Sequence, residues 1–262
     1  MANLRAALEA IAQADGEYRT ATPEGWTQGR TLYGGMTAAM SAHVASQFAA
    51  PLPPLRCAQF SFVGPAAGAL VFRPLLLRQG RTATGIGVDC FSDGQLAARG
   101  VLTYGAARPS VVRHERRLET PAPAPEQCAP FLDPARSGAG FFQNFDLRLA
   151  RGSRLASGTA APPAFDVWIR HRDADGVDPA VALLALADGL PPAAMAQFPS
   201  RAPISTMTWA IDIVQPLTQH AWLLARSVSE ACADGYSQQA MALFDPEGAR
   251  VAAGRQTIAI FV

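Results

Sequence analysis

The chain carries one pattern of residues twice, and this duplication constrains its fold more than any other feature. Two segments of the first half have counterparts in the second half, namely Phe60–Pro65 with Ile211–Pro216 and Asp93–Val101 with Pro246–Gln256. Pro65 and Pro216 are 151 residues apart and Gly94 and Gly248 are 154 apart, so the pattern recurs at a nearly constant offset. Solenoid repeats have periods of about 20 to 50 residues. A period this long predicts two fused, related domains that arose by gene duplication.

The length of 262 residues accommodates two domains of ordinary size. We predict an N-terminal repeat over residues 1–106, a linker over residues 107–142 and a C-terminal repeat over residues 143–262. The linker is predicted because this segment is rich in proline and arginine and has no hydrophobic periodicity.

The charge of the chain is nearly balanced. Its 22 basic residues are all arginine and stand against 21 acidic residues, which gives a formal net charge of +1. Such a chain has no broad basic surface, so we expect no nucleic-acid partner. The lack of lysine excludes Schiff-base chemistry and a phosphate loop that needs lysine. An alanine-rich chain with arginine in place of lysine is typical of a GC-rich bacterial genome.

The cysteines and the N-terminus indicate a reducing compartment. Cys57, Cys90, Cys128 and Cys232 have no C-x-x-C spacing, so we expect neither a metal site nor a disulfide framework. Acidic residues interrupt the N-terminus where a signal peptide is apolar, and no later run reaches the roughly 18 apolar residues of a membrane-spanning helix. We therefore predict a cytoplasmic protein that does not enter a membrane.

The hydrophobic periodicity predicts the same order of elements in both halves. In the first half, two extended pieces between Gly16 and Gln28 precede a buried helix that runs from Gly35 to a point before Pro51. The strands of this half are predicted at Cys57–Val63, Leu70–Arg78, Thr82–Phe91 and Gln95–Tyr104. The second half is predicted to contain strands at Phe145–Arg151 and Phe165–His171, a helix at about Asp178–Leu190, and strands at Ile204–Val214, Ala221–Glu230, Tyr236–Phe244 and Ala249–Phe261. Short turns favour antiparallel pairing, so the fold class is α+β, with each sheet wrapped around its helix.

This element order resembles the hotdog fold, and two fused copies resemble the double-hotdog acyl-CoA thioesterases of the acyl-CoA thioesterase II-like family. Thr31–Met40 is similar to that family's aromatic-Gly-Gly entry into the first hotdog helix. The resemblance implies an enzyme of lipid metabolism that hydrolyses acyl-CoA thioesters to free acid and CoA. It also implies no cofactor other than the coenzyme A of the substrate.

The resemblance further implies three residues that hold the hydrolytic water. In the family these are an aspartate on the second helix, a threonine on the next strand and a glutamine on the last strand. In this chain Asp188, Thr206 and Gln256 match them. Asp188 is then the general base toward a water that Thr206 and Gln256 orient.

The pattern of the second helix supports the aspartate independently. Its apolar stripe contains Val181, Leu184 and Ala185 and then places Asp188 at the i+7 position. Burying an unpaired carboxylate costs on the order of several kcal/mol, so hydrogen-bond donors or a wet pocket must accompany it. The alternative is that the helix ends earlier and Asp188 forms a C-terminal turn with Gly189.

The strand patterns leave alternatives open for the other two residues. Gln256 shares a face with Ile258 and Ile260, so it is either a site residue or a satisfied core glutamine. Thr206 falls opposite the apolar set of its strand, which consists of Met207, Trp209, Ile211 and Ile213. Either a bulge reverses the facing early in the strand, or the apolar face packs on another layer, or Thr208 is the participant.

The first half lacks a matching set of residues. The repeat alignment places Val101 where the second half has Gln256, and His43 where it has Asp188. A histidine on an apolar helix face is more often a core residue than a catalyst. We therefore predict one site per chain. The alternative enzyme is a hotdog dehydratase or hydratase that uses His43, and the alternative without chemistry is a protein that only binds acyl-CoA or another acyl ligand.

The substrate is expected to bind near the start of the first helix, at Tyr33, Gly34, Gly35 and Met36. Backbone N–H groups at a helix N-terminus stabilise an oxyanion, and glycine allows the substrate to approach closely. The double glycine is equally compatible with a tight packing turn. The acyl chain is expected in an apolar slot, for which the candidates are Met36, Met40, Met207 and Trp209, although such stripes are commonly core.

The expected partners are an acyl-CoA substrate and a second copy of the chain, which together form a homodimer of double hotdogs. A dimer is expected because the apolar strand face of Met207, Trp209, Ile211 and Ile213 would otherwise have no cover.

Overall fold

The computed structural model describes residues 3–132, 139–158, 163–215 and 222–262. Its first half contains α1 (Leu4–Glu9), β1 (Ala12–Ala14), β2 (Glu17–Ala21), β3 (Thr27–Gln28), β4 (Thr31–Leu32), α2 (Gly34–Phe48), β5 (Leu55–Phe62), β6 (Ala69–Gln79), β7 (Ala83–Ser92) and β8 (Gln95–Gly105). The buried helix and the four strands predicted for this half are α2 and β5 to β8, whose ends differ from the prediction by at most two residues.

The second half repeats this order. It contains β10 (Phe145–Gly152), β11 (Ala164–His171), α4 (Pro179–Ala187), β12 (Ile204–Ile213), β13 (Leu223–Ala233), β14 (Tyr236–Phe244) and β15 (Arg250–Ile260). A short 3-10 helix, η3 (Ala193–Gln197), follows α4. Each predicted strand of this half corresponds to one of these strands. Pro216 of the predicted repeat and Ala221 of a predicted strand lie outside the described residues.

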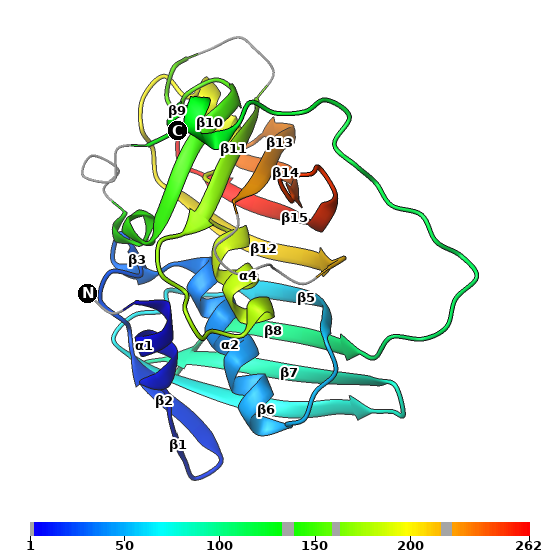
Figure 1. The fold of residues 1–262 in the computed structure, drawn as a ribbon. Coiled ribbons are helices and arrows are strands. Elements are labelled where there is room, and N and C mark those ends of the chain that lie inside the picture. Colours follow the sequence, from blue (N-terminus) through cyan, green and yellow to red (C-terminus); the bar gives the residue numbers. More distant parts are fainter. Residues whose placement is uncertain (1–2, 133–138, 159–162, 216–221) are drawn as a thin grey trace.

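Thirteen of the described strands form one antiparallel sheet across both repeats, and β3 and β4 pair with each other in a separate small sheet. Reading outward from the contact between β5 and β12, the order is β5-β8-β7-β6-β2 in the first half and β12-β15-β14-β13-β11 in the second. The two halves are therefore related by an approximate two-fold axis between β5 and β12, as a duplication predicts. Figure 1 shows the halves stacked along this shared sheet.

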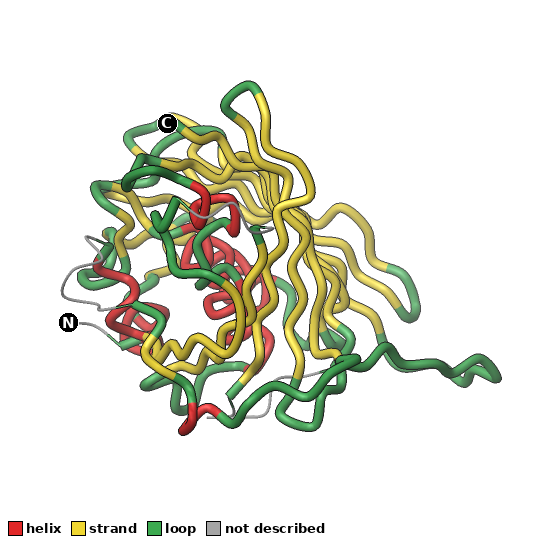
Figure 2. Tube along the Cα trace, turned by 90° about the horizontal axis from the view of Figure 1, so that it is seen from above, coloured by secondary structure: helices red, strands yellow, loops and turns green. Residues whose placement is uncertain are grey.

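Two buried helices cover one face of the sheet. α2 and α4 pack against each other, α2 also contacts β6, β7 and β8, and α4 contacts β11. Both helices lie on the concave side of the curved sheet (Figure 2). α2 is small or apolar nearly all round and α4 is apolar throughout, so each can be buried on every side without leaving a polar face in the core. Within the described residues no helix has the length and apolar character needed to cross a membrane.

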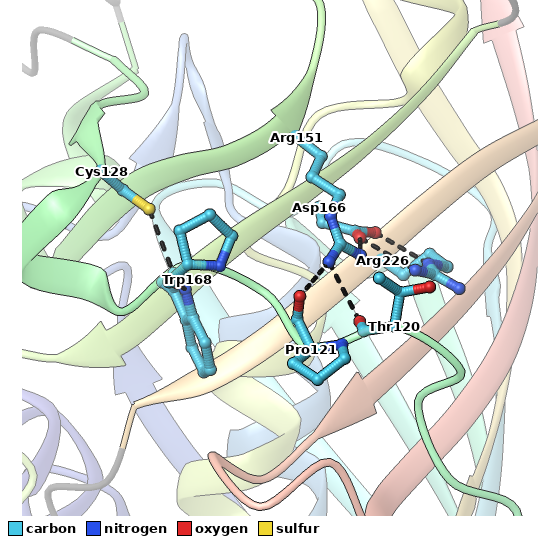
Figure 3. A network of polar contacts seen from close by, with 8 residues as sticks. Thr120, Pro121, Cys128, Arg151, Asp166, Trp168 and Arg226 are labelled. Carbon is cyan, nitrogen blue, oxygen red and sulfur yellow. Dashed lines mark hydrogen bonds and ion pairs between the residues drawn. The ribbon is translucent and has the colours of Figure 1, made fainter.

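The segment predicted as a linker is not uniform. Its second part contains η1 (Pro125–Gln127), β9 (Ala129–Pro130) and the start of η2 (Gly140–Asn144), and β9 pairs with β10. The Arg151 guanidinium donates hydrogen bonds to the carbonyls of Thr120 and Pro121 and forms an ion pair with the buried Asp166 (Figure 3). Trp168 Nε1 donates to the Pro123 carbonyl at 2.8 Å. Much of this segment is thus fixed to the second repeat, because its carbonyls find donors there.

The apolar face that motivated the predicted dimer is covered within the chain. Trp209 and Ile211 are each only 1% exposed and belong to the core, whereas Met207 is 42% exposed on the other side of β12. The stated reason for dimerisation is therefore wrong, since this strand face packs inward. A homodimer remains a prediction without that support.

Candidate active site

Asp188 lies immediately after the last turn of α4. The helix begins at Pro179 with the Asp178 side chain accepting from the backbone N–H groups of residues 180 and 181, and it ends at Ala187. The predicted end at Leu190 is therefore wrong by three residues. Gly189 closes the turn by donating to the Leu186 carbonyl at 2.9 Å, and a Cβ there would lie 2.5 Å from Ile169 Cδ1. Asp188 thus forms a C-terminal turn with Gly189, which is the alternative that the sequence left open, and it is nevertheless buried.

The Asp188 carboxylate is buried and accepts two donors. Asp188 is only 8% exposed. Gln256 Nε2 donates to Asp188 Oδ1 at 2.5 Å, and the backbone N–H of Gly35 donates to the same carboxylate. A Cβ added to Gly34 would lie 2.8 Å from Asp188 Oδ2. The carboxylate of the second repeat therefore rests on the N-terminus of the helix of the first repeat.

This position gives Asp188 an unusual protonation equilibrium. Burial raises the pKa of the Asp188 carboxyl from 3.8 to about 7, while the hydrogen bonds from Gln256 and Gly35 act in the opposite direction. The positive end of the α2 dipole also favours the ionised form. A carboxyl with a pKa near neutrality is poised to accept and return a proton, which is the requirement for a general base.

Thr206 reaches the same site because β12 contains a bulge. Thr206 pairs with Ile258 and Thr208 with the adjacent Thr257, which leaves Met207 as an extra residue. The bulge reverses the alternation, so Thr206 shares the inner face with Trp209, while Thr208 is exposed on the outer face. Of the three alternatives left open by the sequence, the bulge is the one that the structure contains.

Asp188 and Thr206 line two adjoining cavities. One, of about 350 Å³, is lined by Gln256 and by apolar side chains that include Leu132, Phe141, Phe142, Leu155, Leu190 and Met195; we call it the apolar cavity. The other, of about 320 Å³, is lined by Gly34, by the loop of residues 63–66, and by the polar residues Gln28, Thr31, Thr37 and Ser205; we call it the polar cavity. The predicted trio thus lies where an apolar and a more polar space meet.

The four residues predicted to bind substrate take different positions. Tyr33 lines the apolar cavity, stacks on Phe141 with 4.0 Å between ring centroids, and donates from its hydroxyl to the Ala185 carbonyl at 3.1 Å. Gly34 lines the polar cavity, and the N–H of Gly35 is engaged by Asp188. Met36 is completely buried in the core and lines neither cavity.

None of the four candidates for the acyl slot lines either cavity. Met36, Met40 and Trp209 are core residues with at most 1% exposure, and Met207 is on the outer face because of the bulge. The apolar cavity is built instead from residues of the predicted linker and from the loop that follows α4. Phe141 and Phe142 lie in a segment without hydrophobic periodicity, so the sequence pattern does not predict them as cavity residues. Two adjacent phenylalanines in such a segment are nevertheless a signal of burial.

At the position of Gln256 the first repeat has an apolar residue. Trp209 pairs with Gln256, and the equivalent pair in the first repeat is Ala58 with Leu102, so the counterpart of Gln256 is Leu102. The prediction of Val101 is wrong by one residue, and Val101 is exposed on the outer face. His43 is half-buried on α2, and burial lowers its pKa, although Asp178 and Glu9 oppose this. His43 lines neither cavity, which separates it from the site.

The sequence alone did not identify Gln239. This residue lies on β14, is 1% exposed, and donates from Nε2 to Gln256 Oε1 at 3.2 Å. Its Oε1 accepts from the backbone N–H of Ala193 at 2.8 Å. The available signal was its period-2 spacing with Ser237 and Met241, which share the inward face. Among the described residues, no three His, Cys, Asp or Glu side chains cluster as a metal site would require.

Solved structures with the same fold cover nearly the whole chain. A hot dog fold protein of unknown function from Alicyclobacillus acidocaldarius is 20% identical, with a TM-score of 0.86 and coverage of 100% of this chain and 99% of that one. The acyl-CoA thioesterase II TesB2 of Mycobacterium marinum is 19% identical, with a TM-score of 0.77 and coverage of 97% and 96%. The tesB protein of Mycobacterium avium subs paratuberculosis is 16% identical, with a TM-score of 0.82 and coverage of 99% and 98%. The fold is therefore a double hotdog.

Family models identify the chain more closely. A model of the acyl-CoA thioesterase N-terminal domain matches residues 22–105, and a model of the acyl-CoA thioesterase C-terminal domain matches residues 125–260. No curated protein matches the chain significantly in sequence. The chain belongs to the acyl-CoA thioesterase family.

Proposed function

We propose that this protein hydrolyses acyl-CoA thioesters to the free acid and CoA at one site per chain, between two hotdog units whose central helices are α2 and α4. The observation that carries the proposal is the buried Asp188, held by Gln256 and Gly35 at the junction of two cavities. A buried carboxylate whose pKa is raised to about 7 stabilises the fold less than a neutral residue would, so its presence argues for chemistry.

The proposed reaction uses water directly. Ionised Asp188 takes a proton from a water molecule while the water oxygen attacks the thioester carbonyl carbon. Thr206 and Gln256 hold this water, since the Gln256 amide has a second N–H besides the one given to Asp188. The tetrahedral intermediate then expels the CoA thiolate, the C–S bond breaks, and the proton on Asp188 passes to the leaving sulfur.

The developing oxyanion requires a donor near the start of α2. The Gly35 N–H already donates to Asp188. We therefore assign the oxyanion to the backbone N–H of Gly34, which lines the polar cavity. The end of the α2 dipole adds positive potential at this point. Glycine is suited to the position because a Cβ there would collide with Asp188 and lie 3.3 Å from Phe62 Cζ.

The two cavities suggest the orientation of the substrate. We place the acyl chain in the apolar cavity, where Phe141, Phe142, Leu155 and Met195 offer apolar surface. The amide-containing arm of CoA is placed in the polar cavity, whose threonine, serine and glutamine side chains match its hydrogen-bonding groups. The thioester then lies at the junction, beside Asp188.

Steady-state release of free CoA tests the proposal. A thiol reagent reports CoA release from a panel of acyl-CoAs that spans short, long and aromatic acyl groups. Wild type is expected to release CoA from at least one member, and Asp188→Ala is expected to lose about 10²- to 10⁴-fold in kcat, the usual contribution of a general base. Binding of acyl-CoA without release would instead identify a binding protein, and full activity of Asp188→Ala would overturn the assignment of the base.

A further inference from the structure

Gln239 is a buried glutamine whose two polar atoms are both hydrogen-bonded. It lies on β14, and its side chain reaches Gln256 on the neighbouring strand β15 and the first residue of η3, Ala193. The residue is 1% exposed, and Gln256 is 5% exposed. Three hydrogen bonds therefore run in series from a backbone N–H to the carboxylate of Asp188.

The backbone N–H at one end fixes the direction of every bond in this series. A backbone N–H only donates, so the atom of Gln239 that faces Ala193 must be the carbonyl oxygen. The amide nitrogen of Gln239 then faces Gln256 and requires an acceptor, which is Gln256 Oε1. The nitrogen of Gln256 is thereby directed toward Asp188. The donor and acceptor roles of the neighbouring groups thus distinguish the oxygen from the nitrogen in each amide, although the two atoms are similar in size.

We infer that Gln239 is a positioning residue that sets the amide orientation of Gln256 and so keeps a donor on Asp188. Without Gln239, the Gln256 amide can rotate and present its oxygen to the carboxylate, which disfavours the ionised base. The series also ties Asp188 to η3, whose Met195 lines the apolar cavity. Residues around the apolar cavity therefore help to position Asp188.

This inference rests on the proposed thioesterase function, and Gln239→Glu tests it. A carboxylate at position 239 still accepts from the Ala193 N–H but has no proton to give to Gln256, so Gln256 turns its nitrogen toward position 239 and away from Asp188. The acid limb of the kcat–pH profile is expected to move upward by about one pH unit, since hydrogen bonds to ionised groups act on this scale. The KM is expected to remain within about two-fold of wild type.

One control variant and a second test variant complete the experiment. Gln238→Glu makes the same change on the adjacent residue of β14, which is exposed on the outer face, and is expected to leave the profile in place. Gln239→Met removes the donor without adding charge and is expected to shift the limb in the same direction by less. The melting temperature of each variant shows whether it is folded.

The outcomes separate this inference from the proposed function. If wild type releases CoA and both folded Gln239 variants keep the wild-type profile, the positioning role is wrong and the thioesterase proposal stands. If wild type releases no CoA, the hydrolysis proposal fails. The positioning role is then decided by a ¹³C-NMR titration that measures the pKa of the Asp188 carboxyl in wild type and in the Gln239 variants. In that titration a rise of the Asp188 pKa in Gln239→Glu supports the role, and an unchanged pKa overturns it.

Discussion

The buried carboxyl of Asp188 should make the protein less stable as the pH rises, and Asp188→Asn should remove this effect. The pKa of Asp188 is raised from 3.8 to about 7 in the folded protein, so the folded state holds a proton that the unfolded chain releases in this interval. Stability from this group is present below pH 4 and is lost as the pH rises to about 7. At about 1.4 kcal/mol per pH unit, the loss amounts to about 4 kcal/mol.

Asparagine keeps the shape of the side chain but does not titrate. Its Oδ1 still accepts from Gln256 Nε2, while its amide nitrogen cannot accept a hydrogen bond as the second carboxylate oxygen can, which costs about 1–3 kcal/mol at every pH. The pH-dependent part of the difference between the variants is therefore the part due to ionisation. For a chain of this size about 4 kcal/mol corresponds to about 10 °C in melting temperature.

The assay is thermal unfolding of wild type and Asp188→Asn by calorimetry at pH 4.5 and pH 8. Between these two conditions ionisation accounts for about 3 of the 4 kcal/mol, so the melting temperature of the variant relative to wild type is expected to rise by about 8 °C. Asp212→Asn changes an exposed aspartate on β12 and is expected to produce no such rise, which controls for the overall charge. A difference between wild type and Asp188→Asn that stays constant or shrinks as the pH rises would refute the reasoning.

Four substitutions test the geometry of the site through CoA release. Gly34→Ala is expected to lower kcat about ten-fold or more, because the new Cβ would lie 2.8 Å from Asp188 Oδ2, and unchanged kcat would contradict this. Thr206→Val is expected to lose about ten-fold in kcat and Thr208→Val almost nothing, since the bulge turns only the first threonine inward; equal effects would argue against the assigned water position. Met195→Trp is expected to raise the KM for long acyl-CoAs more than for acetyl-CoA, and an equal change for both would place the acyl chain elsewhere.

The order of the elements was predictable because it depends on periodicity, which the sequence displays directly. Burial alternates with a period of two along strands such as β7, and the helices α2 and α4 are small or apolar on nearly every side. The double hotdog fold and the family followed from that order and from the Tyr33-Gly34-Gly35 motif.

The details of the site depended on local geometry that the sequence does not display. The amino-acid sequence of β12 does not indicate a bulge at Met207, and this bulge decides which threonine faces the cavity. The end of α4 at Ala187 and the close contact between Gly189 and Ile169 are likewise features of the folded chain. The apolar cavity draws on residues from the predicted linker, which only the tertiary structure brings beside α4.

The second glutamine illustrates the same limit. Gln256 was found through its match to a family motif, whereas Gln239 has no motif and is recognised only because β14 and β15 pair in register. Its role depends on the direction of three hydrogen bonds in series, which is a property of the folded chain.

The pH dependence of CoA release tests the central claim, that ionised Asp188 is the base, most directly. For wild type, kcat should rise ten-fold per pH unit at low pH and level off near pH 7, where the Asp188 pKa lies. Asp188→Asn should show a low rate without this inflection. A wild-type rate that does not change between pH 5 and pH 9, or an Asp188→Asn variant with the wild-type profile, would contradict the claim.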